Sequence, residues 1–241
     1  MDTKDTAAPA RLRIRVWDLP TRVVHWALVA AVATAVITGN LGGAWMVLHQ
    51  AAGLAVAGLV VFRIVWGFVG STHARFASFV PGPATLVAYW RGRWRGLGHN
   101  PLGALSVLGL LALLGAQVGT GLFSNNDIDF AGPWAVQVPD VWSTRLTGLH
   151  LRLANALYIL VGLHVLAIVW HAVVKKDNLV KPMWTGDKEA DAGEPARPVG
   201  WPVFALALGS ALAAVVIVSG AGGPAMAPAP PQAVKEAKPG W

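Results

Sequence analysis

The stretch TGLHLRLANALYILVGLHVLAIVWH, residues 147–171, is apolar along most of its length and carries His150 and His164, 14 residues apart. An α-helix rises 1.5 Å per residue, so the two histidines lie ~21 Å apart along the axis, most of the thickness of a bilayer's hydrocarbon core. Because 14 residues is close to four helical turns, both imidazoles leave the helix on nearly the same face. The stretch predicts a membrane-spanning helix with one histidine near each membrane surface.

The composition of the whole chain also indicates a membrane protein. Hydrophobic residues make up 55% of the sequence, charged residues make up 13%, and the mean hydropathy is +0.53, which excludes an ordinary soluble domain. The chain has no cysteine, so disulfides, thiolate zinc sites, iron–sulfur clusters and covalently attached haem are all excluded. Tryptophans recur near the ends of the apolar stretches, as expected for an interfacial aromatic belt.

Five apolar stretches are long enough to span a membrane, and we expect an all-α integral membrane protein. The expected spans are residues 23–39, 45–69, 101–123, 144–174 and 199–219. A cleaved signal peptide is the alternative for the first stretch, but the stretch is long for one and contains His25. The predicted organisation is a cytoplasmic segment 1–22, a four-helix domain 23–176, a cytoplasmic loop 177–198, a fifth helix 199–220 and a flexible periplasmic tail 221–241.

The distribution of basic residues predicts the orientation in the membrane. Fourteen Lys and Arg residues fall in segments 1–22, 70–99 and 175–198, whereas the alternate segments hold only Arg145, Lys235 and Lys238. Basic loops stay on the cytoplasmic side, so the N-terminus is expected in the cytoplasm and the C-terminus outside. The net charge of +7 is therefore interpreted as a topology signal and not as a nucleic-acid footprint.

Two further histidines match the first two in depth. His49 and His150 both lie near the outer ends of their spans, whereas His25 and His164 each lie ~21–23 Å below the outer surface by helical rise. Paired imidazoles at matched depth on facing helices are what six-coordinate haem iron needs. The sequence therefore predicts two haems, one held by His49 and His150 and the other by His25 and His164.

The alternatives to haem ligation are an interfacial role for each histidine and a pathway for protons or metal ions. Ionisable residues inside membrane spans are costly, and such a pathway needs embedded carboxylates, which the expected spans lack. Arg63 lies 14 residues after His49, at the level of the deeper haem, and Arg152 follows His150. Each is a candidate partner for haem propionates, and snorkelling toward phosphate headgroups is the alternative.

Several motifs together resemble the bacterial cytochrome b561 family, which shares its core with the cytochrome b subunits of nickel–iron hydrogenases. Besides residues 147–171, the resemblance rests on RVWDLPTRVVHW at 15–26, RIVWG at 63–67, GHNPLG at 98–103 and KKDNLVKPMWTG at 175–186. It covers about residues 11–186. It implies a four-helix bundle with two non-covalent b-type haems, each held by two histidines, and the family ligands fall on His25, His49, His150 and His164.

The function that this resemblance implies is electron transfer across the bacterial inner membrane, not bond-making at iron. The expected partners are the quinone pool, with a quinone site beside one haem, and a redox protein such as a periplasmic c-type cytochrome or a dehydrogenase in a respiratory chain. One alternative is a superoxide oxidase that passes electrons to ubiquinone, for which Arg145 and Arg152 would supply the outer positive charge. The other is a haem-bearing anchor subunit of a hydrogenase-like complex.

The chain departs from the four-helix family core by its fifth span and its Pro/Ala-rich tail. His171 follows His164 by seven residues and is expected at the level of the lipid headgroups. In GHNPLG, Asn100 is expected to cap the third span, with Pro101 in its first turn. We expect a structural role for His99.

Overall fold

The computed structural model describes residues 12–128, 130–190 and 192–220, and within these it contains five helices long and apolar enough to cross a membrane. This confirms the predicted helical membrane fold. The long helices are α1 (Leu19–Leu41), α2 (Met46–Val69), α5 (Pro101–Gly121), α6 (Asp140–Val173) and α8 (Trp201–Val218). The short helical elements are η1 (Gly43–Trp45), η2 (Thr72–Ala74), α3 (Phe76–Phe79), α4 (Pro83–Trp90), η3 (Ala135–Gln137) and α7 (Val180–Thr185).

The helix boundaries follow from residues that cap the first turn. Asp18 caps α1 by accepting a hydrogen bond from the Thr21 amide at 2.7 Å, so this helix begins four residues before the expected 23. Asn100 caps α5 through the Gly103 amide at 2.7 Å, as predicted, with Pro101 in the first turn. Helix α6 begins at Asp140 and not at the expected 144.

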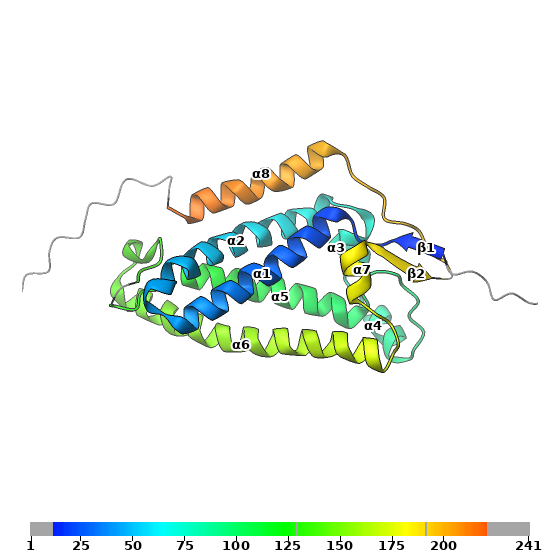
Figure 1. Ribbon diagram of the computed structural model, residues 1–241, viewed down its shortest axis with the longest axis horizontal. Coiled ribbons are helices and arrows are strands. Elements are labelled where there is room, and N and C mark those ends of the chain that lie inside the picture. The colour runs from blue at the N-terminus through cyan, green and yellow to red at the C-terminus, as the bar shows by residue number, and fades with distance from the viewer. Residues whose placement is uncertain (1–11, 129, 191, 221–241) are drawn as a thin grey trace, which may run out of the picture.

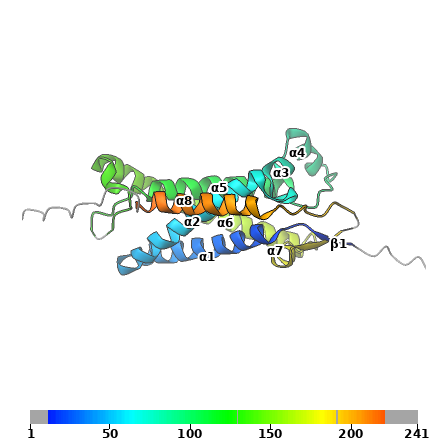
Figure 2. The ribbon, with the colours of Figure 1, turned by 90° about the horizontal axis from the view of Figure 1, so that it is seen from above.

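Helix α2 lies at the centre of the bundle and packs against α1, α5 and α8, while α5 packs against α6 (Figure 1). Two apolar clusters hold the helices together. One joins α2 to α8 and α1 through Phe62, Trp66, Ala207, Ala211 and Val24. The other joins α2 to α5 and α6. Seen from above, α8 runs along α2, and α1 lies to one side of α5 (Figure 2).

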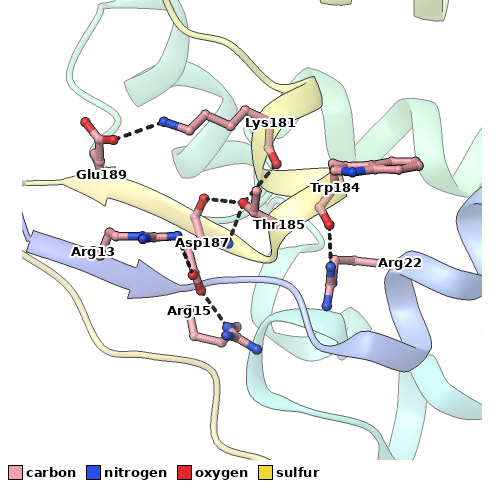
Figure 3. Close-up of polar contacts among 8 residues, drawn as sticks. All are labelled: Arg13, Arg15, Arg22, Lys181, Trp184, Thr185, Asp187 and Glu189. Carbon is pink, nitrogen blue, oxygen red and sulfur yellow. Dashed lines mark hydrogen bonds and ion pairs between the residues drawn. The ribbon is translucent and has the colours of Figure 1, made fainter.

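A two-stranded sheet closes one end of the bundle, which we call the inner end. Strand β1 (Leu12–Arg15) pairs antiparallel with β2 (Asp187–Ala190), with Leu12 opposite Ala190. Asp187 accepts hydrogen bonds from Arg15 Nε at 2.5 Å and from Arg13 Nη2 at 3.3 Å (Figure 3). The segment 177–198 was predicted as a plain loop, but it contains α7 and β2. The strands are only four residues long, and their pairing depends on contacts distant in the sequence.

Hydrogen bonds to Gly186 connect the motif at residues 15–26 with the motif at residues 175–186. Its carbonyl oxygen accepts hydrogen bonds from the amides of Val16 at 2.8 Å and Trp17 at 3.0 Å. Its φ of 91° suits glycine, and a Cβ there would lie 2.8 Å from the Trp17 carbonyl oxygen. The loop 122–139 between α5 and α6 lies at the opposite end, which we call the outer end (Figure 1). Residues 1–11 of the predicted N-terminal segment and the predicted tail 221–241 lie outside the described residues.

Candidate functional site

The structure brings His49 and His150 together at the outer end. His49 lies in the first turn of α2 and His150 lies on α6, and their ring centroids are 6.1 Å apart with the planes at 82°. A metal ion bonded to each imidazole at about 2 Å fits between rings at this separation. The two histidines that matched in depth in the sequence are therefore neighbours in space.

Hydrogen bonds to the backbone orient both outer rings. Nδ1 of His49 donates to the Ala35 carbonyl oxygen at 2.8 Å, and Nδ1 of His150 donates to the Gln117 carbonyl oxygen at 2.9 Å. Because a carbonyl oxygen only accepts, each Nδ1 carries the proton and each Nε2 keeps its lone pair. This is the arrangement found in metal-binding histidines, whose second nitrogen donates to a carbonyl or carboxylate group.

Two glycines leave room for these rings. A Cβ at Gly39 would lie 2.8 Å from His49 Nδ1, and a Cβ at Gly121 would lie 2.9 Å from His150 Cε1. Both histidines line a cavity of about 390 Å³ between α1, α2, α5 and α6, which we call the outer cavity. Its volume lies within the range typical of ligand and cofactor sites.

The outer cavity is covered by residues that the sequence analysis did not identify. Phe130, in the loop after α5, lies edge-on to His49 with ring centroids 6.4 Å apart. The Gln117 side-chain amide lies 3.1 Å from His150 Nε2, and Thr120 Oγ1 lies 3.2 Å from His150 Nδ1. A signal for the last two was present, because Gln117 and Thr120 are polar residues in an apolar span.

A buried apolar cluster separates the outer and inner levels of the bundle. It consists of Val56 and Val60 from α2, Leu114 from α5 and Leu157 from α6. Leu157 lies seven residues from both His150 and His164, so it marks the midpoint between them. The two levels are therefore held apart by packed side chains, without polar groups between them in this cluster.

The inner histidines lie in a different environment. His164 Nδ1 is 3.3 Å from Ser106 Oγ on α5, and the His25 ring packs edge-on against Trp26. The Nδ1 atom of His25 is buried and has no hydrogen-bond partner among the described residues. Unlike the outer pair, His25 and His164 show no ring contact with each other in the part of the chain that the structure describes.

The two candidate arginines differ strongly in burial. Arg63 is 7% exposed, donates to the Ala74 carbonyl oxygen at 3.2 Å, and lies over the rings of Phe76 and Phe79. Its Nη2 atom has no partner within the described residues. Arg152 is exposed on α6. Arg145, also at the outer end, lies over the ring of Trp142 at 5.1 Å.

His99 lies next to the inner site, in the loop before α5. Its ring packs between Trp17, at 4.6 Å, and Phe79, at 4.5 Å, and its Nδ1 is buried without a partner among the described residues. Burial, with smaller contributions from the nearby charges of Arg63, His164, His25 and His73, lowers the pKa of His99 to about 3. His99 is therefore neutral at physiological pH, and its apolar packing agrees with the expected structural role.

His171 is held by the capping residue of α5. Its Nδ1 donates to the Ala167 carbonyl oxygen at 2.9 Å, and its Nε2 lies 3.2 Å from Asn100 Nδ2. With both nitrogens engaged by protein groups, His171 links α6 to the start of α5.

Residues 16–186 match the sequence model of one protein family, prokaryotic cytochrome b561. The chain belongs to this family. It is therefore a membrane b-type cytochrome, and the resemblance noted in the sequence is confirmed. The match ends before α8, so the fifth helix lies outside the matched region.

The curated relatives of this cytochrome are distant. A probable Ni/Fe-hydrogenase B-type cytochrome subunit of Bradyrhizobium diazoefficiens is 22% identical, with 78% of this chain and 91% of that protein covered. One from Azotobacter chroococcum is 24% identical over 72% of this chain and 87% of that protein. A probable Ni/Fe-hydrogenase 1 B-type cytochrome subunit of Escherichia coli is 24% identical, with 46% of this chain and 60% of that protein covered. No solved structure matches the chain.

The residues of the cytochrome's outer cavity fit a haem group. Two imidazoles lie close together with their Nδ1 atoms bonded to the backbone, so that each Nε2 has a lone pair, and the lone pair of His150 is within reach of the Gln117 side-chain amide. Two glycines leave space behind the rings, and the cavity walls are largely apolar. At the inner end, the unpartnered Nδ1 of His25 and Nη2 of Arg63 fit a ligand that carries acceptor groups.

The polar residues of α5 are the functional candidates that the sequence analysis missed. Ser106 contacts His164, while Gln117 and Thr120 contact His150. These are the polar side chains of an otherwise apolar span, and helix periodicity places them on one face with neighbouring histidines.

Proposed function

We propose that this cytochrome holds two non-covalent b-type haems, each between two histidines. His49 and His150 would hold the outer haem, and His25 and His164 would hold the inner one. The observation that carries the proposal is the outer pair, whose rings lie 6.1 Å apart with both Nδ1 atoms bonded to backbone carbonyls. The inner pair is supported by the matched depth of His25 and His164 below the outer surface, by helical rise.

Haem b held by two histidines supplies reversible one-electron chemistry and no open position for substrate at iron. The protein residues hold the imidazoles in a fixed orientation and exclude water from the bundle. Ala35 and Gln117 fix the outer rings through their carbonyl oxygens, and Ser106 contacts the inner ring of His164. Fixed ligands in apolar surroundings keep structural rearrangement small when the charge of the site changes.

The electron route we propose runs across the membrane between the quinone pool and a partner redox protein. The relatives named as Ni/Fe-hydrogenase B-type cytochrome subunits favour a hydrogenase-like dehydrogenase as partner over a c-type cytochrome. The excess of basic residues in segments 1–22, 70–99 and 175–198 favours a cytoplasmic location of the inner end in a bacterial cell. The protein then acts in electron transfer and not as a stand-alone oxidoreductase.

Purified protein tests the proposal in two steps. A pyridine haemochrome assay is expected to give two haem b per chain. A quinol added to proteoliposomes is expected to reduce the haems, which is measured as a change in their absorption bands. A ratio of one haem per chain, or bands that respond to dithionite but not to quinol, would contradict the corresponding part of the proposal.

A further inference from the structure

The segment between α2 and α5 is basic and has no acidic residue to balance it. Residues 70–99 contain four arginines and no aspartate or glutamate. The other long inner segment, 175–198, holds as many acidic as basic residues, five of each. Its acidic residues bind nearby cations, as Asp187 binds Arg13 and Glu189 binds Lys181 (Figure 3). The positive charge of segment 70–99 therefore has no internal counterpart.

The end of α4 places three of the four arginines close together. Gly92, with a φ of 67°, follows the helix, and its amide donates to the Tyr89 carbonyl oxygen at 2.9 Å. The Arg93 amide donates to the Ala88 carbonyl oxygen at 2.8 Å. These two bonds form a Schellman turn, which ends a helix with the chain folded back. The Trp94 ring contacts the Tyr89 ring, with centroids 6.3 Å apart, so the chain after the turn stays beside α4.

The side chains of these three arginines, Arg91, Arg93 and Arg95, are exposed. None of them forms an ion pair in the part of the chain that the structure describes. Nη1 of Arg95 donates to the carbonyl oxygens of Gly92 at 3.2 Å and Trp94 at 3.3 Å, which carry no net charge. Three cations thus lie on one turn of the chain with their charges unpaired.

Helix α4 adds an apolar face beside the arginines. Pro83, Leu86, Val87 and Trp90 follow the spacing i, i+3, i+4, i+7, which places them on one side of the helix. Val87 is 46% exposed and Trp90 is 75% exposed, and α4 stands away from the long helices at the inner end (Figure 2). An exposed apolar helix face next to basic residues is typical of helices that lie in the membrane interface, where tryptophan is also enriched.

We propose that α4 and the three arginines after it, together the α4 surface, bind the headgroups of anionic phospholipids. The segment joins the end of one spanning helix at Val69 to the start of the next at Pro101, so it lies at the membrane surface. Guanidinium groups bind phosphate through two parallel hydrogen bonds. An acidic protein would neutralise the arginines, but a lipid also covers the apolar face of α4 with its acyl chains.

Lipid binding to the full-length cytochrome tests the role of the arginines. Native mass spectrometry measures the binding of phosphatidylglycerol and phosphatidylcholine to the purified protein. We expect the wild type to prefer phosphatidylglycerol, and the variant Arg91→Gln/Arg93→Gln/Arg95→Gln to lose at least about five-fold of that preference, the value of one cation near an anionic surface. No preference in the wild type, as expected if the arginines bind an acidic protein, would overturn the inference.

A second triple variant controls for the total charge. Arg13→Gln/Lys181→Gln/Arg197→Gln removes the same charge from three exposed side chains at the inner end, but each of these is already paired with a carboxylate. This variant is expected to keep the preference for phosphatidylglycerol. An equal loss in both triple variants would overturn the assignment to the α4 surface.

Spin labels test whether the apolar face of α4 lies in the interface. The chain has no cysteine, so Val87→Cys and Thr85→Cys each give one labelling site, on the apolar and the opposite side of α4. Both positions are exposed, so the labels are expected to leave the fold unchanged. In liposomes containing phosphatidylglycerol, power saturation is expected to show the label at 87 more accessible to oxygen, and the label at 85 more accessible to a water-soluble nickel chelate. Equal access of the chelate to both labels would overturn the inference.

Both experiments measure lipid contacts and need neither quinone nor electron transfer. Their failure would leave the proposed electron route standing, and a failure of quinol to reduce the haems would leave the α4 surface standing.

Discussion

The outer and inner ends of the bundle each hold a histidine pair with one member on α6, but the two pairs have very different surroundings. At the outer end, the rings of His49 and His150 contact each other, and the backbone fixes both Nδ1 atoms. At the inner end, His25 and His164 contact other side chains, and among the described residues six buried polar atoms there lack partners, against two at the outer end, Gln117 Oε1 and Trp134 Nε1. The six inner atoms are His25 Nδ1, Arg63 Nη2, Ser71 Oγ, His99 Nδ1, Thr21 Oγ1 and Arg22 Nε.

This difference indicates that the polypeptide itself orients the outer rings, whereas the inner end leaves more buried polar atoms for bound groups to satisfy. Buried polar atoms without partners destabilise a fold, and the cost is removed when a ligand satisfies them. We therefore expect the inner end to gain more stability from its ligands than the outer end does. Each of the following predictions tests that contrast.

The largest effect is expected from removing one ligand of each pair. His150→Ala is expected to lower the pyridine haemochrome ratio from two haems per chain to one, with loss of the outer haem, and His164→Ala is expected to do the same for the inner haem. Redox titration identifies the haem that remains. His171→Ala is the control, since His171 lies seven residues beyond His164 and contacts Asn100 at the start of α5, and it is expected to keep both haems. A His150→Ala or His164→Ala variant that keeps both haems contradicts the assignment.

A methyl group behind an outer ring is expected to weaken only the outer site. In Gly121→Ala the new Cβ would lie 2.9 Å from His150 Cε1, so the ring must shift, and we expect about a ten-fold loss in outer haem affinity. Haem-release kinetics measure this. Gly119→Ala is the matched control on the same helix, because a Cβ there meets nothing within 4 Å. Equal behaviour of the two variants would contradict the predicted packing.

Removing the buried inner cation is expected to change one redox potential. Arg63→Gln deletes a positive charge that is 7% exposed and near the inner site, so the reduced state of the inner haem loses stabilisation and its midpoint potential falls by tens of millivolts. Spectroelectrochemical titration measures both haems. Arg152→Gln, at an exposed position, is the control. A fall in the midpoint potential of the outer haem alone would contradict the position of Arg63 near the inner haem.

The smallest effect is a pH dependence of stability from His99. Its pKa of about 3 lies below the ordinary value of 6.5, so stability is fully present above pH 6.5 and is lost as the pH falls from 6.5 toward 3. The loss approaches about 1.4 kcal/mol per pH unit within that window. Thermal unfolding at pH 7.5 and 5.5 is expected to differ less in His99→Leu than in the wild type. An equal pH response in the variant and the wild type would contradict the prediction.

Much of the fold could be predicted from local sequence, and the part that could not depends on contacts between distant segments. The apolar stretches and the cap at Asn100 are local features, and the structure has them close to where they were expected. The start of α6 at Asp140 was missed because the first turns are polar and lie outside the apolar stretch. The sheet between β1 and β2 was missed because each strand is too short to show a pattern.

The sequence alone determined that the chain is a bundle of membrane helices with histidines at two levels, because helical spacing and hydropathy are properties of contiguous residues. Only the tertiary structure decided that the backbone binds Nδ1 of each outer histidine and that Gly39 and Gly121 make room for the rings. These features depend on the packing of one helix against another. That packing is set by the fit of whole side-chain surfaces and cannot be read from the periodicity of any single helix.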